Sequence, residues 1–319
     1  MLDEGTVKAV NGVDLDVYRG RTLGIVGESG CGKSVTAQSI MRIIPSPPGE
    51  IVDGSINLIR NGSTVDLASL KKNDKVLRSI RGHQISMIFQ EPMTSLSPVH
   101  TVGMQIMEVL RLHQGLDKAQ ARKRAIERLQ QVGIPRPEKV VDAYPHQLSG
   151  GMRQRAMIAR ALACEPQILI ADEPTTALDV TVQAQILRIL ADLQRDLGMS
   201  LVLITHDLGV IAQVADYVTV FYLGIIVEEA PVQMLFARPR HPYTQALFSS
   251  IPHIEQSGRL SPIRGSVPDP FAVVTGCPFR DRCDKAVQQC AGDEVPPQYT
   301  VEPEHRVRCF LCETSGMQQ

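Results

Sequence analysis

The chain has 319 residues, a formal net charge of −1 and 43% hydrophobic residues. This length suffices for about two domains, and the near-zero charge excludes a protein whose global field draws it to nucleic acid or acidic lipid. The longest apolar runs, such as 201–205 and 218–227, fall well below the ~18 residues that span a bilayer. The first ten residues lack the basic and apolar regions of a signal peptide, so we expect a cytoplasmic protein.

The first predicted element is a short buried strand, TLGIV, at residues 22–26. Directly after it, residues 27–34 read GESGCGKS and fit the phosphate-loop pattern G-x-x-x-x-G-K-[ST] without a gap. A helix is predicted over 35–44, where the stretch PSPPG ends it. A strand, a glycine-rich loop and a helix in this order predict a site whose backbone N–H groups and helix N-terminus face phosphate oxygens.

Two side chains of this loop have chemistry of their own. Lys33 can bridge the β- and γ-phosphates of a nucleotide, and the Ser34 hydroxyl can ligate Mg²⁺. Cys31 occupies a variable position of the pattern, where we interpret it as a small filler. The predicted nucleotide-binding residues of the loop are Gly27, Glu28, Ser29, Gly30, Cys31, Gly32, Lys33 and Ser34.

The middle of the chain contributes a polar strand end and a second anion site. Gln90 follows an apolar run that begins at residue 85, so its amide is placed to ligate Mg²⁺ or to hold a water. Small and apolar residues at helical spacing then predict a helix from about Ser149 to Ala163. Ser149 is a favourable N-cap, and Gly150 and Gly151 leave the first amides of this helix open. Because one nucleotide cannot easily use both anion sites of a compact fold, we expect a second copy of the fold, turned head to tail.

Two further apolar strands end in residues suited to hydrolysis. Asp172 and Glu173 follow the strand 167–171, at the edge where parallel sheets place ligand chemistry. Asp172 is the expected direct or indirect partner of Mg²⁺, and Glu173 is placed to orient or deprotonate a water in line with the γ-phosphate. The strand 200–205 ends at His206, which we expect at the same sheet edge, near the γ-phosphate.

The composition changes near residue 225. Eleven of the 21 prolines and five of the seven cysteines lie after residue 227. Zinc sites usually have short C-x₂₋₄-C knuckles, and here the only C-x₂-C pair is Cys309–Cys312. The spacing also misses the common ferredoxin patterns, and disulfides are disfavoured in the cytoplasm. Four thiolates at one metal centre would supply folding energy to such a segment, and unligated cysteines are the alternative. The predicted ligands are Cys277, Cys283, Cys290 and Cys309, with Cys312 as a substitute for Cys309.

Six motifs in order over about 180 residues resemble those of the nucleotide-binding subunits of ABC transporters. They are GESGCGKS as Walker A, Gln90 as the Q-loop, LSGGM at 148–152 as the signature, ILIADE at 168–173 as Walker B, ALD at 177–179 as the D-loop and His206 as the switch histidine. The resemblance implies two subunits that sandwich two ATP molecules. It implies that Ser149, Gly150 and Gly151 contact the partner's nucleotide, and that Asp179 lies at the subunit interface.

Three other stretches resemble the oligopeptide and dipeptide importer ATPases. They are FQEPMTSLSPVHTVGMQIMEVL at 89–110, HPYTQALFSSIP at 241–252 and GCPFRDRC at 276–283. This resemblance implies two permeases that receive the closure of an ATPase pair, an extracytoplasmic solute-binding protein, and a peripheral place on the cytoplasmic face of the plasma membrane. It also implies a [4Fe–4S] cluster on the cysteines, as some members of the group carry, while zinc or no metal stays open.

One departure from that family concerns the adenine base. The family has an aromatic residue near the end of its first strand, and here such a residue falls at or before Met1. Tyr18 lies further on, in what the pattern predicts as the next strand, and we do not assign it to the base.

We therefore expect an α/β P-loop core of the ABC type over 1–225, with a helical subdomain over about 96–165 and a small loop-rich, metal-binding appendage over 226–319. Within the subdomain, the segment 117–134 has one charged and one apolar face. We interpret its charged face as a solvated helix face and not as a nucleic-acid patch. The expected function is ATP hydrolysis that drives uptake of dipeptides and oligopeptides. The alternatives are import of another solute, such as an oligosaccharide or nickel, and a soluble ABC protein that acts on nucleic acid or ribosomes.

Overall fold

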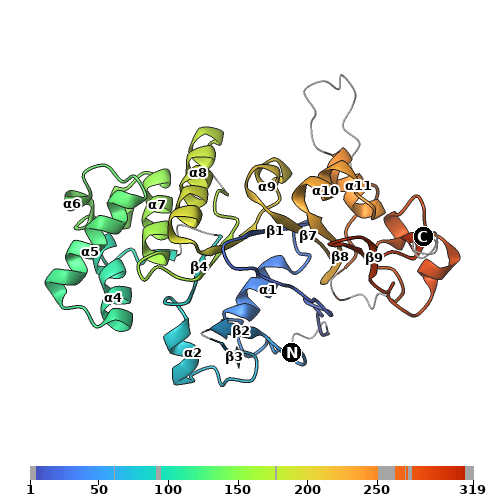
Figure 1. Ribbon diagram of the computed structural model, residues 1–319, viewed down its shortest axis with the longest axis horizontal. Coiled ribbons are helices and arrows are strands. Elements are labelled where there is room, and N and C mark those ends of the chain that lie inside the picture. The colour runs from blue at the N-terminus through green and yellow to red at the C-terminus, as the bar shows by residue number, and fades with distance from the viewer. Residues whose placement is uncertain are drawn as a thin grey trace. The chain divides into compact units, whose positions relative to one another are not determined.

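The computed structural model describes residues 5–60, 62–90, 95–176, 178–250, 263–269, 271 and 275–312. They divide into two compact units, and Figure 1 shows the ribbon of the chain. The terminal unit consists of Met1–Asp16, Thr22–Thr36 and Thr205–Gln319, and the central unit consists of Val17–Arg21 and Ala37–Ile204.

The described residues of the terminal unit form five strands. They are β1 (Thr22–Val26), β7 (Tyr217–Tyr222), β8 (Ile225–Pro231), β10 (His305–Val307) and β9 (Tyr299–Glu302). β1 pairs with β7 in parallel, whereas β7, β8, β10 and β9 follow one another as antiparallel neighbours. All five residues of β1 are buried, which confirms the strand predicted from the run TLGIV.

The helices of the terminal unit are short. They are α9 (Leu208–Val214), α10 (Val232–Ala237), α11 (Pro242–Ser249) and two 3₁₀ turns, η2 (Arg280–Arg282) and η3 (Gln288–Ala291). The helix after the glycine-rich loop, α1 (Lys33–Ile40), starts two residues earlier and ends four residues earlier than the predicted 35–44. It ends early because Arg42 adopts a left-handed backbone, with φ of +54°, and a right-handed helix cannot continue through that conformation.

The segment after residue 226 is more regular than its proline content predicts. Its strand β10 adds to β8, where the N–H of Arg308 donates to the carbonyl of Val227 at 2.8 Å. At the same junction His305 Nε2 lies 2.8 Å from Glu228 Oε1, and both side chains are fully inaccessible to solvent. Burial of such a pair is favourable only with further hydrogen bonds, and Glu228 also accepts the N–H groups of Arg240 and His241. The tail is therefore tied to the sheet of the terminal unit by backbone and buried polar contacts.

Where the structure describes it, the central unit has three parallel strands and a hairpin. The parallel strands, in spatial order, are β4 (Ile85–Ile88), β5 (Ile168–Asp172) and β6 (Ser200–Ile204), and the hairpin pairs β2 (Asn57–Arg60) with β3 (Ser63–Asp66). Ile88 pairs with Ala171 and Ala171 with Leu203, so the three predicted strand ends of this unit meet at one edge. A short helix, α2 (Lys75–Ile80), follows the hairpin, and the long helix α8 (Val180–Leu197) precedes β6.

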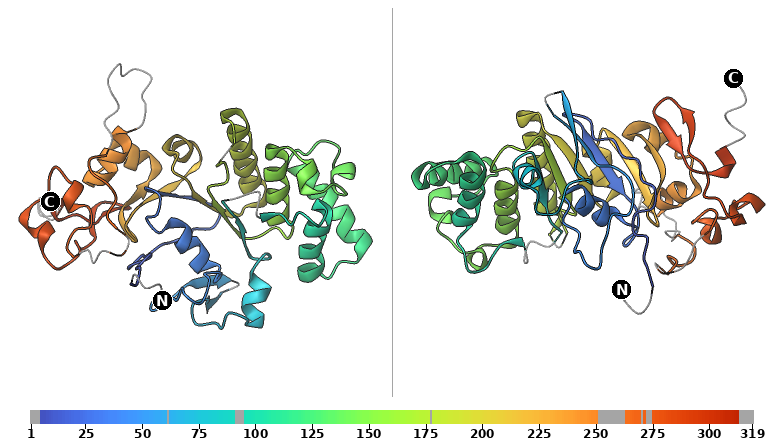
Figure 2. Two further views of the ribbon diagram at one scale, coloured as in Figure 1. Left: turned by 180° about the vertical axis from the view of Figure 1, so that it is seen from behind. Right: turned by 90° about the horizontal axis from the view of Figure 1, so that it is seen from below.

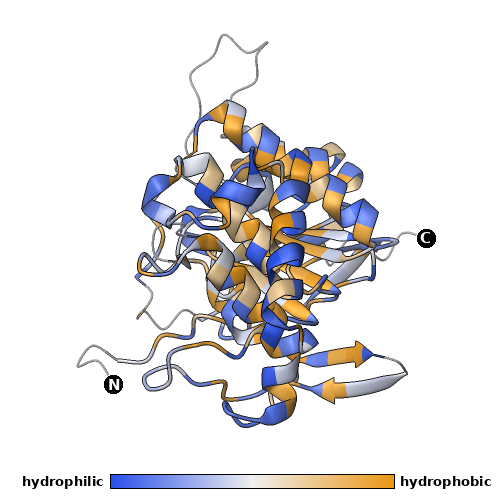
Figure 3. Cartoon of the chain, turned by 90° about the vertical axis from the view of Figure 1, so that its left-hand side faces the viewer, coloured by the Kyte–Doolittle hydropathy of each residue, from blue (hydrophilic) through white to orange (hydrophobic). Residues whose placement is uncertain are grey.

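The described residues of 96–165 are helical and contain no strand. Their elements are α4 (Val102–Gln114), α5 (Lys118–Gln131), α6 (Pro137–Val140), η1 (Pro145–Gln147) and α7 (Gly150–Ala161). Figures 1 and 2 show α4, α5 and α7 side by side, and Figure 3 shows hydrophobic and hydrophilic residues interleaved around these helices. In α5 the residues Ala121, Ala125 and Leu129 are fully buried at a spacing of four, which confirms the two-faced helix predicted over 117–134.

Tyr18 does not lie in a strand: it begins a turn in which its carbonyl accepts the N–H of Arg21, and its side chain is 63% exposed. Gly20, with φ of +67°, allows this turn. Throughout the described ranges, no helix combines the length and the apolar character needed to cross a membrane.

Candidate nucleotide site

Three glycines of the loop between β1 and α1 have backbone conformations that favour glycine. Gly27, Gly30 and Gly32 have φ of +148°, +80° and +100°, a region that costs other residues free energy. A Cβ on Gly27 would lie 2.3 Å from the carbonyl oxygen of Phe221, and one on Gly32 would lie 2.1 Å from that of Ala9. The glycines of the motif thus serve both the curl of the loop and its close approach to neighbouring backbone.

Lys33 is almost fully buried inside this loop. Its Nζ donates to the carbonyl oxygens of Gly27 at 2.8 Å and Glu28 at 2.9 Å. Cys31 Sγ lies 3.7 Å from the same ammonium, and burial raises the pKa of this thiol, against the opposing pull of the Lys33 charge. The ammonium is therefore held inside the curl of the loop by two carbonyl oxygens, where a phosphate contact of the predicted kind needs a cation.

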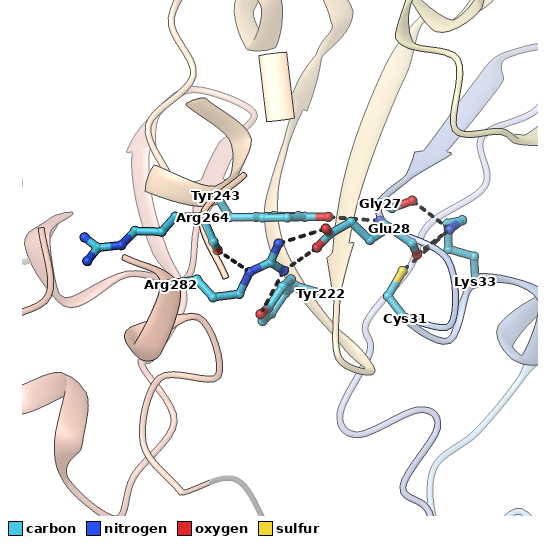
Figure 4. Close-up of polar contacts among 8 residues, drawn as sticks. All are labelled: Gly27, Glu28, Cys31, Lys33, Tyr222, Tyr243, Arg264 and Arg282. Carbon is cyan, nitrogen blue, oxygen red and sulfur yellow. Dashed lines mark hydrogen bonds and ion pairs between the residues drawn. The ribbon is translucent and has the colours of Figure 1, made fainter. Parts of the chain in front are cut away.

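Glu28 is held from the C-terminal part of the chain (Figure 4). Its backbone N–H donates to the Tyr243 hydroxyl at 2.9 Å, and its carboxylate accepts two hydrogen bonds from Arg282, at 2.6 and 2.9 Å. The carboxylate raises the pKa of the Arg282 guanidinium above its usual range. Sequence reasoning included Glu28 but missed Tyr243 and Arg282. The only sequence feature at these two residues is that they lie in the stretches 241–252 and 276–283. Nothing in either stretch indicates that Arg282 pairs with Glu28, which is 254 residues away.

In the central unit, the predicted Gln90 and Glu173 come together. Gln90 Nε2 donates to Glu173 Oε2 at 3.1 Å, and the hydroxyl of Thr176 donates to the same oxygen at 2.8 Å. Asp172 directly precedes Glu173, is the last residue of β5 and is buried. Glu173 has φ of +45°, a strained conformation that is concentrated at functional sites. One carboxylate is thus oriented by two donors, as a group that positions a water would be.

His206 belongs to the terminal unit. The N–H of Thr205 donates to the carbonyl of Ile25 in β1 at 3.3 Å, so the exposed His206 follows at the end of β1 from which the phosphate loop departs. Asp207 caps α9 by accepting the N–H groups of Gly209 and Val210. The histidine therefore lies between a strand end and a helix start, one residue after the contact with β1, and its predicted place near a γ-phosphate stays a prediction.

The predicted second anion site lies at the start of α7. The Ser149 hydroxyl oxygen accepts the N–H of Met152 at 3.3 Å and caps the helix, and Ser149 and Gly150 are exposed. A Cβ on Gly151 would lie 3.0 Å from Val182. Asp179 is itself the N-cap of α8, where its carboxylate accepts the N–H of Val182 at 2.9 Å. Ala177, the first residue of the predicted D-loop, lies outside the described residues.

The cysteines of the tail gather but form no metal site in the described ranges. The N–H of Cys277 donates to the carbonyl of Cys290 at 3.0 Å. Burial, with the nearby thiols of Cys290, Cys309 and Cys283, raises the pKa of Cys277 to about 12. Cys309 and Cys312 pack with Val307 in a small apolar cluster. Within the part of the chain that the structure describes, no group of three or more His, Cys, Asp or Glu side chains is placed to hold a metal ion. The metal-binding character predicted for the tail is therefore unsupported by this arrangement.

The chain is similar to known protein families and to individual known proteins. The sequence profile of the family described as "ABC transporter" matches residues 10–176, and that described as "Oligopeptide/dipeptide transporter, C-terminal region" matches residues 227–290. The oligopeptide transport ATP-binding protein AppD of Bacillus subtilis (strain 168) is 51% identical over 314 residues, which cover 98% of this chain and 94% of AppD. The dipeptide transport ATP-binding protein DppD of the same strain is 52% identical over 309 residues, which cover 96% of this chain and 90% of DppD.

A solved structure is similar as well. It is the dimeric structure of a post-hydrolysis state of the ATP-binding cassette MJ0796 bound to ADP and Pi. It aligns with a TM-score of 0.60 at 30% identity and covers 70% of this chain and 90% of the MJ0796 chain.

Proposed function

The chain belongs to the ABC transporter family, and from this premise we propose that it is the ATP-binding subunit of an importer of dipeptides and oligopeptides. It has the α/β P-loop fold of the ABC ATPases, and it hydrolyses ATP. The observation that carries the proposal is the combination of a complete phosphate loop with a C-terminal region, residues 227–290, that matches the oligopeptide and dipeptide transporters. Two peptide-transport ATP-binding proteins match nearly the whole chain, which supports the same conclusion.

We propose the following roles in hydrolysis. Lys33 and the N–H groups of the loop bind the phosphates. The Lys33 ammonium is suited to this role because two loop carbonyls hold it inside the loop. Ser34, Gln90 and Asp172 supply hydroxyl, amide and carboxylate oxygens, the ligands that Mg²⁺ prefers. Gln90 donates to Glu173 through its amide nitrogen, which leaves the amide oxygen for a metal ion. A Mg²⁺ ion held by these oxygens would supply positive charge against the phosphates. Glu173, oriented by its two donors, would accept a proton from the attacking water.

A second ATPase subunit, identical or related, completes each site in this proposal. Ser149, Gly150 and Gly151 contact the partner's nucleotide, His206 contacts the γ-phosphate in its own copy, and Asp179 lies at the interface. The exposure of the α7 start supports this role, because a helix N-terminus that faces solvent is free to meet an anion. The dimeric state of the MJ0796 cassette supports the pairing.

The remaining partners are proposed from the relatives. Two permeases span the membrane, a separate extracytoplasmic protein delivers the peptide, and this chain acts peripherally at the cytoplasmic face of the plasma membrane. The relatives named as transport ATP-binding proteins support this division of labour.

We also propose a [4Fe–4S] cluster on Cys277, Cys283, Cys290 and Cys309. Its support is limited to the donor chemistry, four thiols from distant positions that influence one another, because the described side chains are not arranged as a metal site. Iron and acid-labile sulfide are measured in anaerobically purified protein, beside a variant with all four cysteines changed to serine. Stoichiometric iron that the variant lacks supports the cluster. Iron-free protein with an ordered tail contradicts it, and bound zinc shows a different metal.

The function is tested by ATP hydrolysis in a reconstituted complex of this chain with its permeases and binding protein. We expect hydrolysis to be stimulated by the binding protein loaded with dipeptides or oligopeptides, and to be lost in Lys33→Ala. Stimulation by an oligosaccharide or nickel in place of peptide would contradict the substrate class. Hydrolysis that persists in Lys33→Ala would contradict the assignment of the site.

A further inference from the structure

Every polar group of Glu28 in the phosphate loop is engaged. Its carbonyl oxygen accepts a hydrogen bond from Lys33 at 2.9 Å, its N–H donates to Tyr243, and its carboxylate accepts both terminal nitrogens of Arg282. Two of the three contacts come from the part of the chain after residue 227, which the phosphate-loop chemistry above does not use. Figure 4 shows the continuous chain of polar contacts from Arg282 through Glu28 to Lys33.

The Arg282 side chain is held by burial and by several polar contacts. Only 4% of it is exposed, its Nε donates to the carbonyl of Arg264 at 2.9 Å, and its Nη1 lies 3.4 Å from the Tyr222 hydroxyl. The guanidinium carbon lies 5.9 Å from the ring centres of both Tyr222 and Phe279, within the range of cation–π attraction. A bidentate pair of this kind sets geometry as well as energy.

Tyr243 is fixed by packing. Its ring is fully buried, with ring centres 4.7 Å from Tyr222 and 5.3 Å from Phe279. Its own N–H donates to His241 Nδ1 at 3.0 Å, at the start of α11. The hydroxyl that accepts the hydrogen bond from the Glu28 N–H is thus held in place by its ring, and it positions the first turn of the loop.

The negative charge of Glu28 lies in the loop that is predicted to bind phosphates, so its pairing with Arg282 affects that site. A carboxylate next to a phosphate site repels the phosphates, since like charges disfavour one another at short range. The two Arg282 hydrogen bonds compensate that charge and direct the carboxylate toward the guanidinium. Without Arg282, the loop would carry an uncompensated negative charge on the same residue whose carbonyl oxygen accepts from Lys33.

We propose that Arg282 and Tyr243 are positioning residues for ATP binding, through which the C-terminal region holds the phosphate loop and neutralises Glu28. This inference rests on the proposed function of the loop as the ATP site. It gives the region after residue 227 a task within the ATPase site itself. A purely structural pair would instead attach the tail to the core with no effect on the nucleotide.

The test is the affinity of the full-length chain for a non-hydrolysable ATP analogue with Mg²⁺, measured by calorimetry. Arg282→Gln is expected to weaken binding on the order of tenfold, as loss of a charge-assisted pair does, and Tyr243→Phe roughly threefold. The double variant Glu28→Gln with Arg282→Gln removes both charges and is expected to recover most of the lost affinity. Arg264→Gln is the matched control, because its guanidinium is 79% exposed and pairs with the equally exposed Asp284.

Each outcome is informative. Arg282→Gln that binds like wild type, or a double variant no better than Arg282→Gln, overturns the inference. A lower melting temperature with unchanged affinity assigns Arg282 to tail attachment and also overturns it. If Arg282→Gln does not fold, Arg282→Lys, which keeps the charge and loses the fork, must show intermediate affinity, and wild-type affinity in both it and Tyr243→Phe refutes the proposal. Wild-type protein that does not bind the analogue contradicts the proposed function instead.

Discussion

Alanine in place of Gly32 should destabilise the chain more than alanine in place of Gly30, two positions earlier. Both glycines have left-handed backbones, with φ of +100° and +80°, and that conformation costs alanine about 1–2 kcal/mol. They differ in their surroundings. A Cβ on Gly32 would lie 2.1 Å from the carbonyl oxygen of Ala9, whereas nothing lies within 4 Å of one on Gly30. Since the obstacle at Gly32 is backbone, it cannot rotate away, and overpacking of this kind adds about 1–3 kcal/mol.

We therefore expect Gly32→Ala to lower the free energy of unfolding by about 2–5 kcal/mol and Gly30→Ala by about 1–2 kcal/mol. Urea unfolding without nucleotide, followed by circular dichroism, measures both. Working without nucleotide keeps contacts with bound phosphate out of the comparison. Equal losses in the two variants would refute the argument that close backbone approach, and not φ alone, requires glycine at position 32.

Three other predictions follow from the described contacts. Glu173→Gln keeps the hydrogen-bonding shape but removes the base, so ATP hydrolysis in the reconstituted complex should fall by roughly 10²-fold or more while ATP still binds; rapid hydrolysis would show that another group is the base. Burial lowers the pKa of His241 to about 4, against the opposing effect of Glu228. Because the unfolded chain then binds the proton more readily, stability should fall as pH falls from about 6.5 toward 4, by up to about 3 kcal/mol. His241→Asn, which can still cap α11, should flatten this dependence in urea unfolding at several pH values, and an unchanged slope would contradict it. Asp117→Ala removes the capping box of α5 and should cost about 1 kcal/mol, a loss that Asp117→Asn should largely avoid in the same assay.

The parts of the site that a sequence pattern predicts are those encoded locally. The strand β1, the curl of the loop and the start of α1 depend on consecutive residues whose backbone preferences are strong. The Ser149 cap is local in the same way, because the residue three positions later donates to it. The meeting of Gln90 with Glu173 was predictable for a different reason, since parallel strands bring their carboxyl ends to one edge.

What the pattern left out depends on distant pairings. The contact between Arg282 and Glu28 joins residues 254 positions apart, and no periodicity reports on such a pair. The strands β9 and β10 are only four and three residues long, too short to stand out from a proline-rich tail. The end of α1 depends on Arg42, whose guanidinium donates to the carbonyl of Leu70 and so reflects tertiary packing. Propensity alone cannot predict an end of that kind.

The most direct test of a peptide importer is uptake itself. Vesicles that carry this chain with its permeases, with ATP enclosed on the side of the ATPase and a labelled dipeptide with its binding protein outside, should accumulate the peptide. Accumulation should cease when ADP replaces ATP and when Lys33→Ala replaces the wild-type chain. Peptide uptake that continues in Lys33→Ala, or vesicles that accumulate a different solute and no peptide, would contradict the account.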